Sequence, residues 1–447
     1  MKKKDYNLTE GPIFKTLLTY STPIIITNVV QLLFVVADIT ILALLVDDNA
    51  VAAVGACGSL ITLLVGLFTG FATGADVLLT RRIGEKFFGK IKTVVGTSIV
   101  VGFISGVILM LVGVVFARDL LQLMNCQPAV LDDATKYLVS YFIGMPIIML
   151  YTFISSIFRA FGDSIRPMKY MLITGFVKIG LNLLMTGSLS VIGVALATNI
   201  SNLIALSMAL YVLFKKKVHC EIKLCDIKAK KEELLEIIKV GVPTCFCSIF
   251  FYIANVILSS VINDISTDAM AANTIAGQFD SIIYNVGCSI AIATSVIIGQ
   301  NYGAGNFERI KKTMRVSIVY TTVVSLSLGL IFVLFSDFIL SMMSDNPAII
   351  DIAKSKLILL CLTYFITSIM EVFSFALRTM GKAIVTMIVG GICGLGIRGA
   401  WAWLICPVYK TLPVVFQSYA VSAFAAIVIY VIVYRKTMKK NYALYSK

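Results

Sequence analysis

The chain alternates between long apolar runs and short polar connections along almost its whole length. Cutting it at charged or turn-rich breaks leaves twelve apolar segments, each long enough for an α-helix to cross a hydrocarbon core of about 30 Å. These segments cover residues 16–46, 50–80, 93–117, 130–158, 168–187, 191–214, 237–262, 269–300, 314–336, 350–377, 383–407 and 412–434. The pattern therefore predicts an all-α membrane protein with twelve transmembrane helices.

The second half of the chain repeats the first half at an offset of 219 residues. At this offset Arg159 aligns with Arg378, and Gly162 aligns with Gly381. Matches in other helix-connecting regions pair Gly84 with Gly303, Phe88 with Phe307, Met124 with Met343 and Pro128 with Pro347. Six spans in each half give both halves the same orientation. We therefore expect two six-helix lobes related by a pseudo-twofold axis along the membrane normal, as in transporters.

The longest polar stretch lies between the two halves of the repeat. It predicts an N-terminal lobe at residues 1–214, a cytoplasmic linker at residues 215–236 and a C-terminal lobe at residues 237–447. The latter part of the polar stretch has acid–base pairs at helical spacing, so we expect a connector with a surface helix rather than a catalytic domain.

Composition excludes an ordinary soluble enzyme, because 59% of the 447 residues are hydrophobic and only 14% are charged. The ten cysteines form no CxxC pair. A GxGxxG string at Gly394, Gly396 and Gly399 lies inside an apolar helix and follows no strand, so it is no dinucleotide motif. We interpret Gly390 and Gly394, like Gly70 and Gly74, as small residues that let membrane helices approach closely. We expect no catalytic residue, metal or cofactor.

The net charge of +14 indicates how the chain is oriented in the membrane, rather than binding to an anionic partner. With the N-terminus inside, 31 of the 38 Lys and Arg residues, Arg378 included, fall on that side, whereas only five, Lys356 among them, fall in the opposite loops. Cytoplasmic loops are the basic ones, so both termini are expected in the cytoplasm and the chain in the cell membrane. No basic stretch has interleaved stacking aromatics, which argues against nucleic acid as a partner.

Six charged residues remain inside the spans, and such charges usually face a cavity or a partner. They are Asp38, Asp76, Lys178, Asp280, Glu371 and Arg398. Asp76 lies five residues from Arg81 near the cytoplasmic end of its span, so we interpret it as structural. Asp38 and Lys178 each lie nine residues, about 13 Å, from the outer end of their spans and can therefore meet. Asn182 lies one turn beyond Lys178 on the same helix face.

The chain resembles the multidrug and toxic compound extrusion (MATE) family of transporters over nearly all of its length. The motifs that carry this resemblance are GQNYGAGNFERIKK (Gly299–Lys312), RAFGDSIRP (Arg159–Pro167), NVVQLLFVVADITILALLVDDNAVAAVG (Asn28–Gly55) and TGADVLLTRRIG (Thr73–Gly84). The resemblance implies export of organic, often cationic compounds against an inward flow of H⁺ or Na⁺. It is to the bacterial branch that has a cation site in the N-terminal lobe, the DinF-like branch.

In that branch, an acid on the first helix pairs with an Asn and an Asp on the fifth and a Thr on the sixth. The resemblance carries these positions to Asp38, Lys178, Asn182 and Thr198, so a lysine stands in place of a neutral ligand. Sodium needs oxygen ligands and anionic charge, and an ammonium group has no acceptor. We expect Lys178 to fill the cation's place, ion-paired with Asp38 and hydrogen-bonded to Asn182 and Thr198, with H⁺ rather than Na⁺ as the coupling ion. The alternative is a permanent structural ion pair.

Two further sets of residues are candidates in the repeat. Asp280 and Glu371 lie near mid-depth and are expected, with Arg398, to line a substrate cavity; alternatively, the acids face neighbouring helices or pair with Arg398. Pro23 and Pro243 lie 220 residues apart, so they predict matched helix bends that act as hinges.

These features together predict a secondary antiporter. It would export small organic, cationic or drug-like compounds by alternating access, as a monomer in the lipid bilayer. One alternative is a flippase for lipid-linked saccharides, which would need several Arg and Lys residues in the cavity, whereas only Lys178 and Arg398 lie inside the spans. A second alternative, an intramembrane lipid-modifying enzyme, would need a polar catalytic cluster near one interface, and the sequence offers none.

Overall fold

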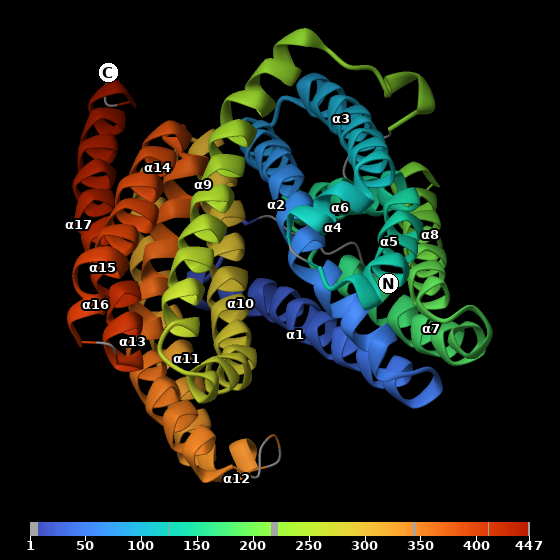
Figure 1. Cartoon of the computed structure of the whole chain (residues 1–447). Coiled ribbons are helices and arrows are strands. Elements are labelled where there is room, and N and C mark those ends of the chain that lie inside the picture. The colour runs from blue at the N-terminus through green and yellow to red at the C-terminus, as the bar shows by residue number, and fades with distance from the viewer. Residues whose placement is uncertain are drawn as a thin grey trace. The chain divides into compact units, whose positions relative to one another are not determined.

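The computed structural model describes residues 8–124, 126–215, 222–341, 343, 346–409 and 411–445, and these residues are almost entirely helical (Figure 1). The helices up to the linker are α1 (Ile13–Leu45), α2 (Asp48–Gly84), α3 (Phe88–Val115), α4 (Ala117–Leu123), α5 (Pro128–Ile143), α6 (Met145–Ala160), α7 (Ile165–Leu189) and α8 (Val191–Lys215). The remaining ones are the 3₁₀ turn η1 (Leu224–Asp226), α9 (Lys231–Asn263), α10 (Thr267–Gly303), α11 (Phe307–Leu334), α12 (Ser336–Ser341), α13 (Pro347–Thr379), α14 (Ala383–Val389), the π-helix η2 (Gly390–Ile397), α15 (Arg398–Leu404), α16 (Cys406–Tyr409) and α17 (Leu412–Tyr445).

Ten helical segments of the described chain are long and apolar enough to cross a membrane, and two bent pairs pass the same test together. One pair is α5 with α6, which meet at 49°; the other is the two parts of α13, residues 347–360 and 363–379, which meet at 46°. The first bend falls at Gly144 and Pro146, where the proline ring lacks the N–H that would continue the helix. Counting each bent pair as one span gives twelve, and the all-α membrane fold is confirmed.

The repeat extends to the boundaries and caps of the helices. Helices α2 and α10 have 37 residues each, and α3 and α11 have 28 each. Asp47 caps α2 by accepting a hydrogen bond from an amide three residues on, and Ser266 caps α10 in the same way. Gly162 and Gly381, which follow α6 and α13, have φ angles of 84° and 82°, a conformation that favours glycine. The paired glycines found in the sequence thus end matching helices.

The described chain divides into two compact units, and the first contains residues 26–245. Within it, α6 packs against α2, α3 and α8, and α7 packs against α8 (Figure 1). Two apolar cores hold these helices together, one around Phe153, Phe158 and Leu79, the other around Leu121 and Phe142. The α-helical scaffold therefore has buried apolar faces inside the unit and leaves other apolar faces outside.

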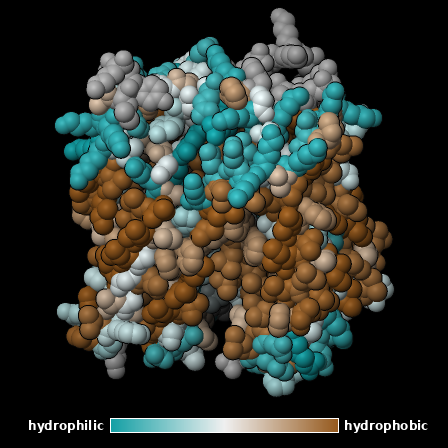
Figure 2. All heavy atoms as spheres, turned by 90° about the horizontal axis from the view of Figure 1, so that it is seen from above, coloured by the Kyte–Doolittle hydropathy of each residue, from teal (hydrophilic) through white to brown (hydrophobic). Residues whose placement is uncertain are grey.

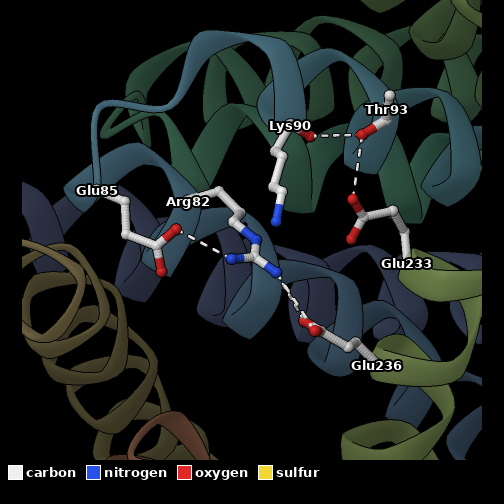
Figure 3. Close-up of polar contacts among 6 residues, drawn as sticks. All are labelled: Arg82, Glu85, Lys90, Thr93, Glu233 and Glu236. Carbon is white, nitrogen blue, oxygen red and sulfur yellow. Dashed lines mark hydrogen bonds and ion pairs between the residues drawn. The ribbon is translucent and has the colours of Figure 1, made fainter.

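The second half of the expected linker packs within the first unit. Residues 216–221 of the linker lie outside the described residues, whereas its last six residues already belong to α9. Arg82 at the end of α2 forms ion pairs with Glu85 at 3.0 Å and with Glu236 of α9 at 3.1 Å (Figure 3). The Thr93 hydroxyl donates to the buried Glu233 carboxylate at 3.2 Å. These contacts fix the start of α9 against the connection between α2 and α3.

The second unit contains residues 8–25 and the described residues from 246 on. Its helix α13 packs against α10, α11 and α17, and η2 packs against α17 (Figure 1). The start of α1 belongs to this unit, because Leu17, Tyr20 and Ile24 share an apolar core with Val296 and Ile297 of α10.

The chain changes unit inside two long helices. It does so between residues 25 and 26 in α1 and between residues 245 and 246 in α9. Each change comes two residues after a proline inside the helix, Pro23 in α1 and Pro243 in α9.

Many large apolar side chains are exposed, as expected of lipid-facing helices. Leu44, Leu184 and Trp403 are each more than three-quarters exposed. Figure 2 shows hydrophobic residues over wide areas of the surface, with hydrophilic residues gathered along the margins of these areas. An apolar surface of this extent is not found on monomeric soluble proteins and indicates contact with lipid.

Candidate functional site

The first unit holds an ion pair between two charged residues of the spans. The Lys178 Nζ of α7 lies 2.5 Å from the Asp38 Oδ2 of α1, and the Asn182 Nδ2 donates to the Asp38 Oδ1 at 2.6 Å. The Asp38 and Lys178 side chains are only 12% and 14% exposed, and Asn182 is fully buried. The predicted pairing of Asp38 with Lys178 is confirmed.

A glycine allows α7 to approach α1 closely enough for this pair. Gly175 lies three residues before Lys178, on the same face of α7, and a Cβ there would collide with the Phe34 ring. Phe34 in turn lies one turn before Asp38 on α1. The ring therefore packs against bare backbone, and the two charged side chains meet one turn further along.

The hydrogen bonds expected from Lys178 to Asn182 and Thr198 are wrong. The Asn182 amide donates to Asp38 instead, so both carboxylate oxygens accept a bond. The Thr198 hydroxyl donates to the Val194 carbonyl of its own helix at 2.9 Å, a bond that threonine commonly forms inside helices. The buried Asn182 Oδ1 has no partner. Ammonium and amide donors thus occupy both oxygens that a bound cation would need.

The second unit contains a second ion pair, which joins Asp280 of α10 to Lys356 of α13 at 2.8 Å. Lys356 is 4% exposed, so its assignment to an outer loop is wrong. Its ammonium group also donates to the Asn273 side-chain and backbone oxygens at 2.9 and 3.1 Å. Lys354 stays partly exposed and pairs with Asp337. Two residues apart on a helix, the two lysines point about 200° apart, so only one of them can face the interior.

Glu371 lines a small cavity of the second unit, which has a volume of about 60 Å³. Arg378 and Arg398 line the same cavity. The Tyr284 hydroxyl approaches a Glu371 oxygen at 3.5 Å, and no ion pair among the described residues joins Glu371 to Arg398. Arg378, which the sequence placed in a loop, lies in the last turn of α13 and is 7% exposed, so it is buried rather than solvated. The interior of this unit therefore has more basic groups than the sequence predicted.

Arg398 is held between aromatic rings. Its guanidinium carbon lies 4.2 Å from the centre of the Tyr419 ring and 5.7 Å from that of Phe251. Its Nε donates to the Ser422 hydroxyl at 3.0 Å. Cation–π contacts of this kind stabilise a buried positive charge without neutralising it.

The segment just before Arg398 is π-helical rather than α-helical. The expected close helix contact at Gly394 is wrong, because a Cβ there would meet no atom within 4 Å, and Gly394 instead lines the small cavity. At Gly74 the same interpretation is right, since a Cβ would meet the Ile237 carbonyl oxygen and Gly241 of α9. π-Helical segments often occur at functional sites.

A larger cavity of about 230 Å³ in the same unit lies beside Asp280 and Arg398. Its other polar lining comes from Asn255, Ser281, Tyr284, Asn285, Tyr364, Thr367 and Tyr419. The three candidates of the second half are therefore distributed over two cavities that share Arg398. Among the described residues, no three His, Cys, Asp or Glu side chains form a group that could hold a metal ion.

Comparisons with known proteins agree with this architecture. The MatE family model matches residues 23–184 and again residues 243–404, once in each half of the repeat. A probable multidrug resistance protein of Bacillus subtilis is 27% identical over 382 residues, which are 83% of this chain and 82% of that protein. A multidrug export protein of Staphylococcus aureus is 28% identical over 340 residues, with 73% and 71% of the two chains covered.

A solved structure shares the fold. A MOP superfamily transporter from Pyrococcus furiosus has a TM-score of 0.91 and is 22% identical, with 99% of each chain covered. At this level of identity the likeness shows the fold alone.

Proposed function

We propose that this chain, which belongs to the MATE family of membrane transporters, exports small organic, drug-like compounds from the cell as a proton-coupled antiporter. The names of its relatives in Bacillus subtilis and Staphylococcus aureus support multidrug export as the activity. Export would proceed by alternating access of the two units, in a monomer, with both termini in the cytoplasm.

The ion pair between Asp38 and Lys178 is the observation that carries the choice of coupling ion. A sodium ion would need oxygen ligands, but both Asp38 oxygens accept hydrogen bonds from nitrogen donors, one of them cationic. The ammonium group also repels a second cation at this place. A proton, by contrast, needs one carboxylate oxygen only. Protonation of Asp38 would remove the negative charge that holds Lys178.

Breaking this pair gives a physical link between the ion and the protein. Lys178 would then be a buried cation without a counter-ion, which is costly in a low-dielectric interior. The first unit would have to rearrange so that Lys178 finds another acceptor or water. We propose that this rearrangement is the step that an inward proton drives.

Efflux from liposomes tests this proposal. Purified protein is reconstituted into liposomes that are loaded with ethidium, an organic cation. Efflux of ethidium is then measured under an imposed pH gradient or sodium gradient. We expect the pH gradient to drive efflux and the sodium gradient to have no effect. Failure of ethidium and of a panel of other organic cations to move under either gradient would contradict the export function.

A double substitution tests the coupling site itself. Lys178→Asn with Asn182→Asp removes the ammonium group and adds a carboxylate, so efflux should become sensitive to sodium. Lys136→Asn, at an exposed lysine paired with Asp133, is the matched control and should leave the ion dependence unchanged. A double variant that folds and transports without any sodium response would contradict the interpretation that Lys178 fills the place of a bound cation.

The saccharide flippase gains one observation in its favour. Arg378, Lys356 and Arg398 are buried, and the Lys178 side chain is only 14% exposed, so four basic residues lie in the interior. Three of them belong to the second unit, where Glu371 and Asp280 lie beside them, so that interior is mixed rather than basic. Scrambling of a fluorescent lipid-linked saccharide in the same liposomes, without ethidium efflux, would favour the flippase.

A further inference from the structure

The larger cavity of the second unit is lined by Arg398, and one nitrogen of its guanidinium group has no hydrogen-bond partner. Arg398 is 2% exposed, and its Nη1 has no hydrogen-bond partner. None of the ion pairs among the described residues includes it. Arginine has five N–H donors, of which Ser422 accepts one. A buried guanidinium in this state has room for an anionic acceptor.

The same cavity is lined by Asp280, and one oxygen of its carboxylate has no hydrogen-bond partner. The Asp280 Oδ2 accepts a bond from Lys356, but the Asp280 Oδ1 is buried without a partner. Lys356 cannot supply it, because the three protons of its ammonium group already face Asp280 and the two Asn273 oxygens. The Asp280 Oδ1 therefore stays available to a cationic group.

Aromatic rings form the wall around these two groups. Phe251 stacks on Tyr284 with ring centres 5.5 Å apart and planes inclined by 11°. Tyr419 and Tyr364 line the cavity as well. The Tyr419 face is already covered by Arg398, so it cannot serve as a cage for a cation from outside. The rings leave apolar surface for the body of a ligand.

We propose that this cavity is a binding site for zwitterionic compounds that have an apolar or aromatic body. The carboxylate of the ligand pairs with the Arg398 guanidinium, whose planar fork matches two carboxylate oxygens. Its ammonium group donates to the Asp280 Oδ1. The π-helical segment ends one residue before Arg398, and its Gly390 and Gly394 line the smaller cavity, which shares Arg398 with this one. As a substrate site the cavity rests on the proposed export function, but as a binding site it does not.

Two fluorescent probes that differ by one carboxylate test this proposal. Nε-dansyl-lysine has a carboxylate and an ammonium group, and dansylcadaverine is its decarboxylated counterpart. Binding of each probe to purified protein is measured by fluorescence polarisation. We expect Nε-dansyl-lysine to bind about tenfold more tightly, because a charge-assisted bidentate pair is added. Equal or weaker binding of Nε-dansyl-lysine to the unaltered protein overturns the proposal, whatever the variants do.

Four variants locate the carboxylate. Arg398→Gln should abolish the preference for Nε-dansyl-lysine, whereas Asp280→Asn should weaken both probes and keep the preference. Arg118→Gln, the same change at an exposed arginine that pairs with Asp132, is the matched control. Lys178 of the first unit, whose side chain is only 14% exposed, is a competing cation in the protein interior. A preference that survives Arg398→Gln but is lost in Lys178→Gln overturns the assignment.

Efflux of the same two probes separates this inference from the export function. Export of dansylcadaverine without preferential binding of Nε-dansyl-lysine would leave the export function standing and refute the site. Preferential binding that depends on Arg398, without export of either probe, would support the site and count against export.

Discussion

At the scale of single residues, the pair of Asp38 and Lys178 has two possible roles that stability and transport measurements separate. A buried ion pair contributes little net stability compared with a well-packed neutral pair. Removing only one partner is different, since it leaves the other charge buried and alone. The side chains are 12% and 14% exposed, so this penalty applies here. The two roles differ in what happens when both charges are removed together.

We predict that Asp38→Asn and Lys178→Met each lower the free energy of unfolding by about 3–5 kcal/mol. The double variant should lose much less, because no uncompensated charge remains, yet its proton-driven efflux should be abolished. Chemical unfolding of purified protein and efflux from liposomes measure the two effects. The control is the exposed pair of Arg118 and Asp132, whose removal should cost less than about 1 kcal/mol. Normal proton-driven efflux by the double variant would show that the pair is structural only.

At the scale of helices, contact between α2 and α9 depends on missing side chains. A Cβ on Gly74 would lie 2.6 Å from the Ile237 carbonyl oxygen and 3.0 Å from the Gly241 nitrogen. Both neighbours are backbone atoms, which cannot turn away as a flexible side chain can. Gly58, on the same helix, has nothing within 4 Å of the corresponding position. The two glycines thus offer the same substitution in opposite surroundings.

We predict that Gly74→Ala destabilises the first unit by about 1–3 kcal/mol, because the helices must move apart to admit the methyl group. Gly58→Ala should be neutral or stabilise by up to about 1 kcal/mol, because alanine favours a helix more than glycine does. Unfolding midpoints of both variants in detergent provide the measurement. Equal effects of the two substitutions would contradict the close packing of α2 on α9.

The number of helices and their repeat could be predicted from the sequence. The repeat was visible because residues such as Gly162 and Gly381, which both need a positive φ, recur at one offset. The structure adds Asp47 and Ser266, which cap matching helices at the same offset. Lengths of apolar runs then sufficed for the number of spans. Local rules of this kind act within a few residues of sequence, so they can be read without a structure.

Burial of single charges could not be predicted in the same way. Lys354 and Lys356 occupy neighbouring positions on α13, and only the packing of α13 against α10 decides that Lys356 is the buried one. The burial of Arg378 could not be predicted for the same reason. Asp38 and Lys178 were predictable because each is the only charge near its depth on its helix. The π-helical segment before Arg398 had no recognised sequence signal apart from its glycines.

At the scale of the whole molecule, the two prolines mark where the chain passes between its compact units. The change of unit follows Pro23 in α1 and Pro243 in α9 by two residues. A proline inside a helix removes one backbone hydrogen bond and clashes with the preceding turn, which makes that turn easier to bend. The proposed alternating access would require the two units to move while α1 and α9 stay continuous. Bending at these prolines would permit such movement.

We predict that Pro23→Ala and Pro243→Ala slow efflux severalfold while they leave the affinity for dansylcadaverine unchanged. Alanine restores the missing N–H, so each helix gains a hydrogen bond and stiffens, and the stability of the folded protein should stay equal or rise by up to about 3 kcal/mol. Rates of efflux from liposomes, probe affinities and unfolding midpoints would be measured on the same preparations. Pro167→Ala is the matched control: Pro167 lies in the first turn of α7, where no helical hydrogen bond is lost, so transport should be unaffected. If the two hinge variants transport as fast as the unaltered protein, then α1 and α9 do not bend at these prolines during transport, and the movement must be taken up elsewhere in the chain.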